Sequence, residues 1–457
     1  MDSLSSNPFQ ANSQQNPTGN RFQQTRVATW NDSGGIGDLN LRISLMPWSQ
    51  AMRDKVLDYV NNAGIPQQLE TRRLEVLDYL GGQADIILSQ EHKGKGCDKE
   101  RKDFPGNQFS MEPRKDSQMN YTTMKREITS SVDDEVVLYR SDLFEKVELP
   151  ENLNVGTGFA VVMLKNKKTG GFVLAISRHH SFEEDKFNNE SNSNNFILKL
   201  NSVLNDLNVD MKNLSVVVGA DGNISASEEQ SKDIKGIHTL LRENGFTIDE
   251  GTSNEPTCFF RNTPAHADTI KVKNGFNSKG VRVVPADTLG LKSWAALDQF
   301  VPKGEDAGQV VSFGYQTVQV KEFAPDQLDE KGLPKGLREV LVHLFPSDHL
   351  PMIMDFMDPA AAAEQFVDIL DEMILSPASK KDVNGKEQIP DPAALALRKM
   401  LFERKILVEG KNWGNYSKSE TLKLARENFS QYIPELKKLH SELIAKLVND
   451  QTKKLNP

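Results

Sequence analysis

Polar side chains that could bind metal ions or transfer protons recur where the apolar segments of this 457-residue chain begin or end. The sharpest example is Ser347-Asp348-His349, which places a carboxylate beside an imidazole shortly before the apolar run at 352–356. The whole set comprises Asn31, Glu91, His179, Asp221, Asn223, Asp268, Asp348 and His349. Chance would scatter such residues along the strands and over both ends, so their repeated position predicts one shared site on loops held by a rigid scaffold.

The residue types in this set indicate which chemistry it could support. Hard carboxylate oxygens suit Mg²⁺ or Mn²⁺ as ligands, and an imidazole gains or loses a proton near neutral pH. Hydrolysis of a phosphate ester needs groups of this kind, because the phosphoryl oxygens must be neutralised, water activated and the leaving oxygen stabilised.

Strands and helices must position these side chains. Continuous apolar runs predict strands that are buried on both faces. They lie at 26–31, 84–92, 135–140, 158–164, 171–177, 214–221, 257–260, 268–272 and 352–356. A period of 3.6 residues predicts helices at about 49–81, 195–207 and 231–244.

Three stretches differ from this alternation of strands and helices. Residues 1–22 are rich in Ser, Asn, Gln and Pro and are expected to be disordered. An insertion is expected around 302–336. Residues 358–457 are rich in Ala, Leu, Glu and Lys and predict a separate helical region, with helices at 359–375, 391–408, 418–430 and 433–453. The expected division is therefore 1–22, a catalytic domain at 23–357 and a helical region at 358–457.

The overall charge and the cysteine content restrict the class of protein. A net charge of −9 argues against a general basic nucleic-acid binder, although the loop at 93–126 carries many Lys and Arg residues and could form a phosphate-binding rim. Cys97 and Cys258 are the only cysteines, and they have no metal-type spacing. This fits a fold that does not rely on disulfides.

The order of the motifs carries a resemblance to a known family. The series Thr-Trp-Asn (29–31), Ile-Ile-Leu-Ser-Gln-Glu (86–91), Arg-His (178–179), Gly-Ala-Asp-Gly-Asn (219–223), Asp-Thr-Ile (268–270) and Ser-Asp-His-Leu-Pro (347–351) resembles the endonuclease/exonuclease/phosphatase superfamily. The resemblance covers about residues 24–357. It implies an α/β fold, a four-layered sandwich of two packed mixed β-sheets flanked by helices, to which the C-terminal all-α region is appended.

The resemblance also implies a role for each residue of the set. Glu91 would be the principal ligand of Mg²⁺ or Mn²⁺, with Asn31 and Asp348 close to the metal. Asp221 would orient or deprotonate the attacking water, and Asn223 would donate to the phosphate. His349 would bind the phosphate or the water, held in one tautomer by Asp268.

Two histidines, His179 and His180, follow the strand at 171–177, and either could be the functional one. His179 would contact the phosphate and help the leaving group, and the strand register favours it over His180. Arg178 and His180 are expected to bind substrate. Arg178 and Ala220 depart from the family pattern, which usually has Thr and Gly at these positions.

The sequence therefore predicts a metal-dependent phosphoesterase, with a nuclease first. Elements typical of inositol polyphosphate 5-phosphatases are absent from the sequence, yet a phosphatase or phospholipase-type hydrolase of inositol phosphates or phospholipids is the first alternative. The second alternative is a catalytically silent binding protein, and residues 358–457 are in either case the expected surface for a protein partner.

The expected location follows from what the sequence lacks. No N-terminal signal peptide and no apolar run of about 18 residues is present, which predicts a cytoplasmic protein or one secreted without a cleavable signal. The Gln/Asn-rich start and the appended helices would also suit a bacterial effector delivered into a host cell.

Overall fold

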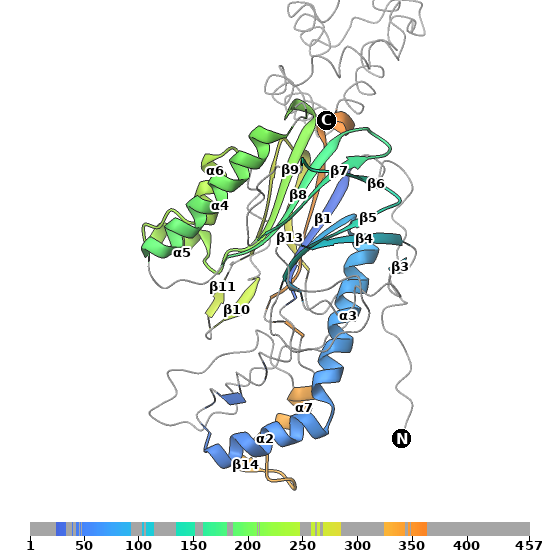
Figure 1. Cartoon of the computed structure of the whole chain (residues 1–457). Coiled ribbons are helices and arrows are strands. Elements are labelled where there is room, and N and C mark those ends of the chain that lie inside the picture. The colour runs from blue at the N-terminus through green and yellow to red at the C-terminus, as the bar shows by residue number, and fades with distance from the viewer. Residues whose placement is uncertain are drawn as a thin grey trace, which may run out of the picture.

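Two mixed β-sheets pack face to face in the computed structural model of the chain (Figure 1). The structure describes residues 24–32, 39, 43–44, 46, 48–92, 103–104, 107–113, 134–150, 159–180, 186–207, 209, 211–246, 257–260, 263–265, 268–284, 324–342, 346–347 and 349–362.

The larger sheet has seven strands in the order β13-β16-β1-β2-β5-β4-β3. Its strands are β1 (Thr25–Asn31), β2 (Ile86–His92), β3 (Asp103–Phe104), β4 (Asn107–Pro113), β5 (Asp134–Arg140), β13 (Phe276–Val283) and β16 (Met352–Met357). β1 and β2 are parallel, and the other neighbouring pairs are antiparallel. The continuous apolar runs that predicted β1 and β2 occupy the centre of this sheet, where both faces are buried.

The smaller main sheet has five strands in the order β12-β9-β8-β7-β6. They are β6 (Phe144–Val147), β7 (Ala160–Asn166), β8 (Phe172–His179), β9 (Leu214–Asp221) and β12 (Asp268–Lys273). β8 and β9 are parallel, and the remaining pairs are antiparallel. Two short hairpins complete the described strands: β10 (Cys258–Phe260) pairs with β11 (Thr263–Ala265), and β14 (Ala324–Leu328) with β15 (Pro334–Lys335).

Helices cover the outer faces of both sheets. α4 (Lys186–Asp206) and α6 (Ile237–Glu243) share an apolar cluster with β8 and β9, and the short α5 (Ala226–Ser231) precedes α6. On the other side, Val76, Leu77 and Leu80 of α3 (Ile65–Gln83) join the apolar cluster of the seven-stranded sheet. The predicted sandwich of two mixed sheets flanked by helices is thus confirmed.

The long helix predicted at 49–81 is divided in two, α2 (Gln50–Asn62) and α3. Gly64 lies between them with φ +66°, a left-handed backbone that glycine adopts readily, and Pro66 occupies the first turn of α3, where a missing N–H is tolerated. The expectation of one continuous helix was therefore wrong at this point.

A third apolar cluster lies at the N-terminal half of α3. α2 and α7 (Leu337–Val342) both pack there, and the three helices lie together in Figure 1. The described part of the insertion expected at 302–336 begins at residue 324 and contributes Leu333 to this cluster.

The beginning of the C-terminal region is anchored on the sandwich. Asp358 accepts hydrogen bonds from the Thr169 hydroxyl at 3.0 Å and from the Ala361 N–H at 2.8 Å, and residues 359–362 are helical. The remainder of the predicted helical region and the predicted disordered segment 1–22 lie outside the described residues. Among the described helices, none has the length and apolar character needed to cross a membrane.

Candidate active site

Four strand ends meet at one edge of the sandwich. Strand register places Asn31 of β1 opposite Gln90 of β2, and His179 of β8 opposite Asp221 of β9. Parallel neighbours end on the same side of a sheet, and β2 packs against β8 across the interface between the sheets. Polar residues that end these runs are therefore brought to one place.

Asp221 is the centre of the cluster, and its side chain is only 1% exposed. Its Oδ2 accepts a hydrogen bond from Asn31 Nδ2 at 2.7 Å, and its Oδ1 accepts one from the Asn223 N–H at 2.8 Å. His349 Nε2 lies 3.5 Å from Oδ2, and His179 Nε2 lies 3.7 Å from it. The carboxylate is thus fixed in direction by two amide donors and faces two imidazoles.

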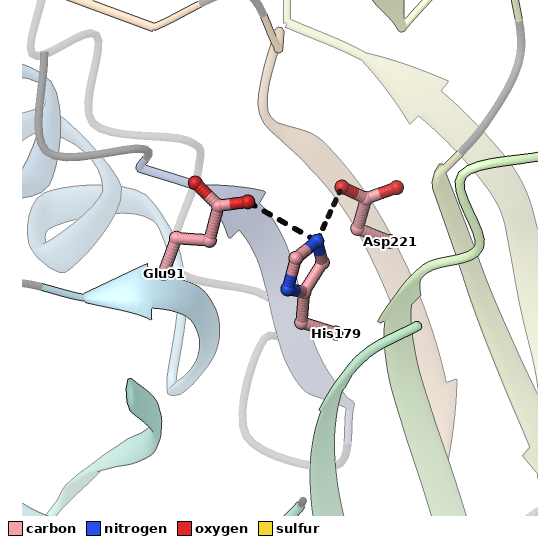
Figure 2. Close-up of side chains that lie close together, drawn as sticks. All are labelled: Glu91, His179 and Asp221. Carbon is pink, nitrogen blue, oxygen red and sulfur yellow. Dashed lines mark ion pairs between the residues drawn. The ribbon is translucent and has the colours of Figure 1, made fainter. Parts of the chain in front are cut away.

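Glu91 and His179 form the more exposed side of the cluster, and Figure 2 shows the His179 ring between Glu91 and Asp221. Glu91 Oε1 lies 3.1 Å from His179 Nε2, and the two side chains are 22% and 28% exposed. The Nε2 atom also lies 3.0 Å from Asn223 Nδ2. Nε2 can donate to the glutamate when it carries the proton, or accept from the amide when Nδ1 carries it.

His349 is held from behind by Asp268. His349 Nδ1 and Asp268 Oδ2 are 2.9 Å apart and both side chains are buried, which leaves Nε2 directed toward Asp221. Burial raises the pKa of Asp268 to about 6, against the opposing effect of His349. The Ser347 hydroxyl accepts from the His349 N–H at 3.0 Å and donates to the carbonyl of Asn31 at 2.6 Å, so the loop is tied to the end of β1.

A second buried group of charges lies directly behind these residues. Asp32 Oδ2 accepts from Arg73 Nη1 at 2.7 Å and lies 2.7 Å from His92 Nδ1. Burial alone would raise the pKa of Asp32, but His92 and Arg73 outweigh it and hold that pKa below its usual value. The carboxylate is therefore ionised at neutral pH.

The structure brings together seven of the eight residues first singled out. They are Asn31, Glu91, His179, Asp221, Asn223, Asp268 and His349. Asp348 lies outside the described residues. The roles predicted for all eight stay predictions.

Arg178 and His180 are placed differently from this cluster. The Arg178 guanidinium lies 5.9 Å from the centre of the Phe196 ring on α4, and His180 Nε2 lies 3.1 Å from the Ser193 hydroxyl on the same helix. Burial lowers the pKa of His180 to about 4, so its imidazole is neutral at physiological pH. His180 reaches the cluster through its backbone carbonyl, which accepts from Asn223 Nδ2 at 2.6 Å. Substrate binding by the two side chains stays a prediction.

Glu135 is a residue of this site that was not anticipated. Its side chain is buried, and its Oε1 accepts from the backbone N–H of His179 at 3.4 Å, across the two sheets. The available signal was its position: Glu135 opens the run of β5, and an antiparallel strand begins where its neighbour β2 ends.

Two overlapping groups of side chains could hold a divalent cation. In the first, Glu91, His179 and Asp221 each offer a ligand atom within 4.8 Å of the others; Asp221, Asp268 and His349 form the second in the same way. Asp268 Oδ1 is buried without a hydrogen-bond partner among the described residues. Each group offers two carboxylates, and carboxylate oxygens are ligands that suit Mg²⁺ or Mn²⁺.

No protein-family model matches the chain, and no curated protein matches it. Among solved structures, an endonuclease/exonuclease/phosphatase family protein from Bacteroides thetaiotaomicron is similar at 14% identity, with a TM-score of 0.40, over 73% of this chain and 97% of that one. The mannosyl-6-phosphatase Bt3783 of the same organism has the same identity and TM-score, and the human Nocturnin catalytic domain has 15% identity and a TM-score of 0.36 over 74% of this chain and 94% of its own.

Proposed function

We propose that the protein is a divalent-metal-dependent hydrolase of phosphate esters. The observation that carries this proposal is the oriented carboxylate of Asp221, held by Asn31 and Asn223 and faced by the imidazoles of His179 and His349. An aligned base with two groups able to bind or protonate phosphate oxygens is what phosphoester hydrolysis requires.

Glu91 would hold the cation, with Asn31 and Asp348 beside it. Bound there, Mg²⁺ or Mn²⁺ would neutralise charge on the phosphoryl oxygens. The partly exposed position of Glu91, against the burial of Asp221, supports a site whose metal side is open to substrate while its base is shielded.

The protein's own residues then divide the work of water activation and charge stabilisation. Asp221 orients the attacking water and takes its proton, because Asn31 and Asn223 fix the direction of both carboxylate oxygens. Asn223 Nδ2 and His349 Nε2 bind the phosphate oxygens as their negative charge grows. His179 supplies a proton to the leaving oxygen, and Glu91, 3.1 Å away, stabilises its protonated form.

A phosphodiester of nucleic acid is the first substrate proposed, because the sequence lacks the motifs of the 5-phosphatase branch. The net charge of −9 counts against a polyanionic nucleic acid outside a local basic rim. A phosphorylated inositol or phospholipid is the second candidate.

A screen for hydrolysis with and without Mg²⁺ or Mn²⁺ over DNA, RNA, phosphoinositides and sphingomyelin tests the proposal. Activity on one class should require metal, be abolished by a chelator and fall by about 10²–10⁴-fold in Asp221→Asn, the range for loss of a general base. The same substitution at exposed Asp206 on α4 is the matched control and should retain full activity.

Two results of this screen would contradict the proposal. Full activity in Asp221→Asn would show that Asp221 is not the general base. Absence of hydrolysis on all four classes, in a folded protein supplied with metal, would favour a binding protein over an enzyme.

A further inference from the structure

A buried charged cluster lies behind the candidate metal ligands and takes no part in the mechanism above. The Asp32 cluster consists of Asp32, Arg73, His92 and Glu70. Arg73 and His92 both meet the same oxygen of Asp32 at 2.7 Å, and the side chains of these three residues are no more than 1% exposed. Burying such charges costs free energy unless each is paired with a partner in good geometry. The positions of these side chains are therefore tightly constrained.

The cluster joins the two chain segments that carry the candidate ligands. Asp32 follows Asn31 at the end of β1, and His92 follows Glu91 at the end of β2. The Asp32 N–H also donates to the carbonyl of Gln90 at 3.0 Å. The Asp32 carboxylate therefore ties the residue after Asn31, which is Asp32 itself, to the residue after Glu91, which is His92. It does so from outside the cation site.

Glu91 needs such support because its backbone is strained. Its φ is +51°, in the left-handed region where a non-glycine residue costs about 1 kcal/mol or more. On one side, the side-chain amide Nε2 of Gln90 donates to Ser177 Oγ at 2.9 Å and to the backbone carbonyl of Leu88 at 3.0 Å. On the other side, His92 is held by Asp32. The strained residue thus lies between two anchored neighbours.

Arginine is the side chain that this geometry demands. Nε and Nη2 of Arg73 donate to the two oxygens of Glu70 at 3.0 and 2.9 Å, which fixes the plane of the guanidinium. Nη1 is then directed to Asp32. A lysine would keep the positive charge, but it could not donate two parallel N–H bonds to Glu70, the fork of the guanidinium, and reach Asp32 at the same time.

We propose that Arg73 is a positioning residue that acts through Asp32 and His92 to hold Glu91 in the orientation used to bind the divalent cation. The inference rests on the proposed function only in taking Glu91 as a cation ligand. Arg73 itself touches neither cation nor substrate. Partners that orient metal ligands from behind contribute about 10–100-fold to metal affinity.

Titration of the protein with Mn²⁺, followed by the loss of the free-ion electron paramagnetic resonance signal, tests this directly and without substrate. Arg73→Met and Arg73→Lys should both raise the Mn²⁺ dissociation constant by about tenfold or more, because charge alone does not replace the fork. Where hydrolysis is measured, the concentration of metal needed for half-maximal rate should rise more than kcat at saturating metal falls.

Glu70→Gln provides the milder variant in case the Arg73 variants do not fold. Glu70 is 20% exposed, so its replacement leaves no buried cavity, yet it weakens the fork that aligns Arg73. Its Mn²⁺ dissociation constant should rise by a few-fold. Glu75→Gln, on the same helix and facing Arg72 instead, is the matched control and should leave Mn²⁺ binding unchanged.

Three results would overturn the proposal. A folded Arg73→Met protein could bind Mn²⁺ with unchanged affinity, or Glu70→Gln could bind Mn²⁺ as tightly as Glu75→Gln does. The third result is a wild-type protein that binds no Mn²⁺. Wild-type Mn²⁺ binding that depends on Arg73, with no hydrolysis of any substrate, would leave it standing and remove the proposed function alone. Metal-dependent hydrolysis whose metal requirement is unchanged in Arg73→Met would support the proposed function and remove the role of Arg73.

Discussion

His349 Nδ1 lies 2.9 Å from Asp268 Oδ2, although the residues are 81 positions apart and belong to a loop before β16 and to the start of β12. Both side chains are buried. This pairing fixes which imidazole nitrogen faces Asp221, and in the proposed mechanism that nitrogen binds a phosphate oxygen. Two measurable consequences follow from the shifted pKa of Asp268.

The first concerns activity and pH. Burial raises the pKa of Asp268 to about 6, so its carboxylate is ionised above that pH and accepts the Nδ1 proton of His349. Hydrolysis should therefore decline as the pH falls below about 6. Asp268→Asn should lower the rate at pH 7 by about a hundredfold and flatten this acid limb. A rate profile from pH 5 to 8 checks both, and an acid limb that persists unchanged in Asp268→Asn would assign it to another group.

The second concerns stability without metal. A carboxyl whose pKa is raised in the folded state stabilises that state below its unfolded pKa and loses this contribution as the pH rises through about 6. Between pH 4 and 7 the loss is at most about 3 kcal/mol, because one pKa unit corresponds to about 1.4 kcal/mol. The free energy of unfolding in urea should therefore fall over this range in the wild type relative to Asp268→Asn. Parallel pH curves for the two proteins would contradict the shifted pKa.

Glu91 permits a test of cation binding by stability alone. A ligand bound only by the folded state raises the free energy of unfolding, by about 2.7 kcal/mol at a hundredfold excess over its dissociation constant. Mg²⁺ or Mn²⁺ should thus raise the melting temperature of the wild type, and Glu91→Gln should lose most of this rise. Glu145→Gln, on an exposed position of β6, should retain it. An equal rise in all three proteins would place the cation elsewhere.

The residues that could be predicted from the sequence are those whose position depends on strand ends alone. Asn31, Glu91, His179 and Asp221 end parallel strands at the centres of two sheets, where a run of apolar residues makes the end visible. The apolar runs predicted individual strands, and the expectation of two packed mixed sheets followed from the family resemblance.

Other features depend on pairings that a sequence does not display. Glu135 reaches the site only because β5 runs antiparallel to β2, and Arg73 meets Asp32 only because α3 packs over the end of β1. The apolar period of residues 49–81 continued across Gly64, which hid the break between α2 and α3. Long-range register and a left-handed glycine therefore account for these omissions.

Gly219 tests whether the close approach of the two sheets positions the site. A Cβ at this residue would lie 2.7 Å from Leu88 Cδ1 and 2.7 Å from Thr29 Oγ1, both on strands of the opposite sheet. Gly219→Ala should therefore destabilise the protein by about 1–3 kcal/mol, as overpacking does in a close-packed interior. The methyl group would push β9, which carries Asp221, away from β1 and β2, which carry Asn31 and Glu91, so hydrolysis should fall as well.

The same substitution at Gly82 supplies the control, because a Cβ there has nothing within 4 Å and the residue is exposed near the end of α3. Gly82→Ala should stabilise the protein by up to about 1 kcal/mol through helix propensity, without effect on hydrolysis. Chemical denaturation of both variants gives the comparison. Equal stability of Gly219→Ala and the wild type would show that the interface can relax around a methyl group, and the spacing of the sheets would then not be what fixes the distance between Glu91 and Asp221.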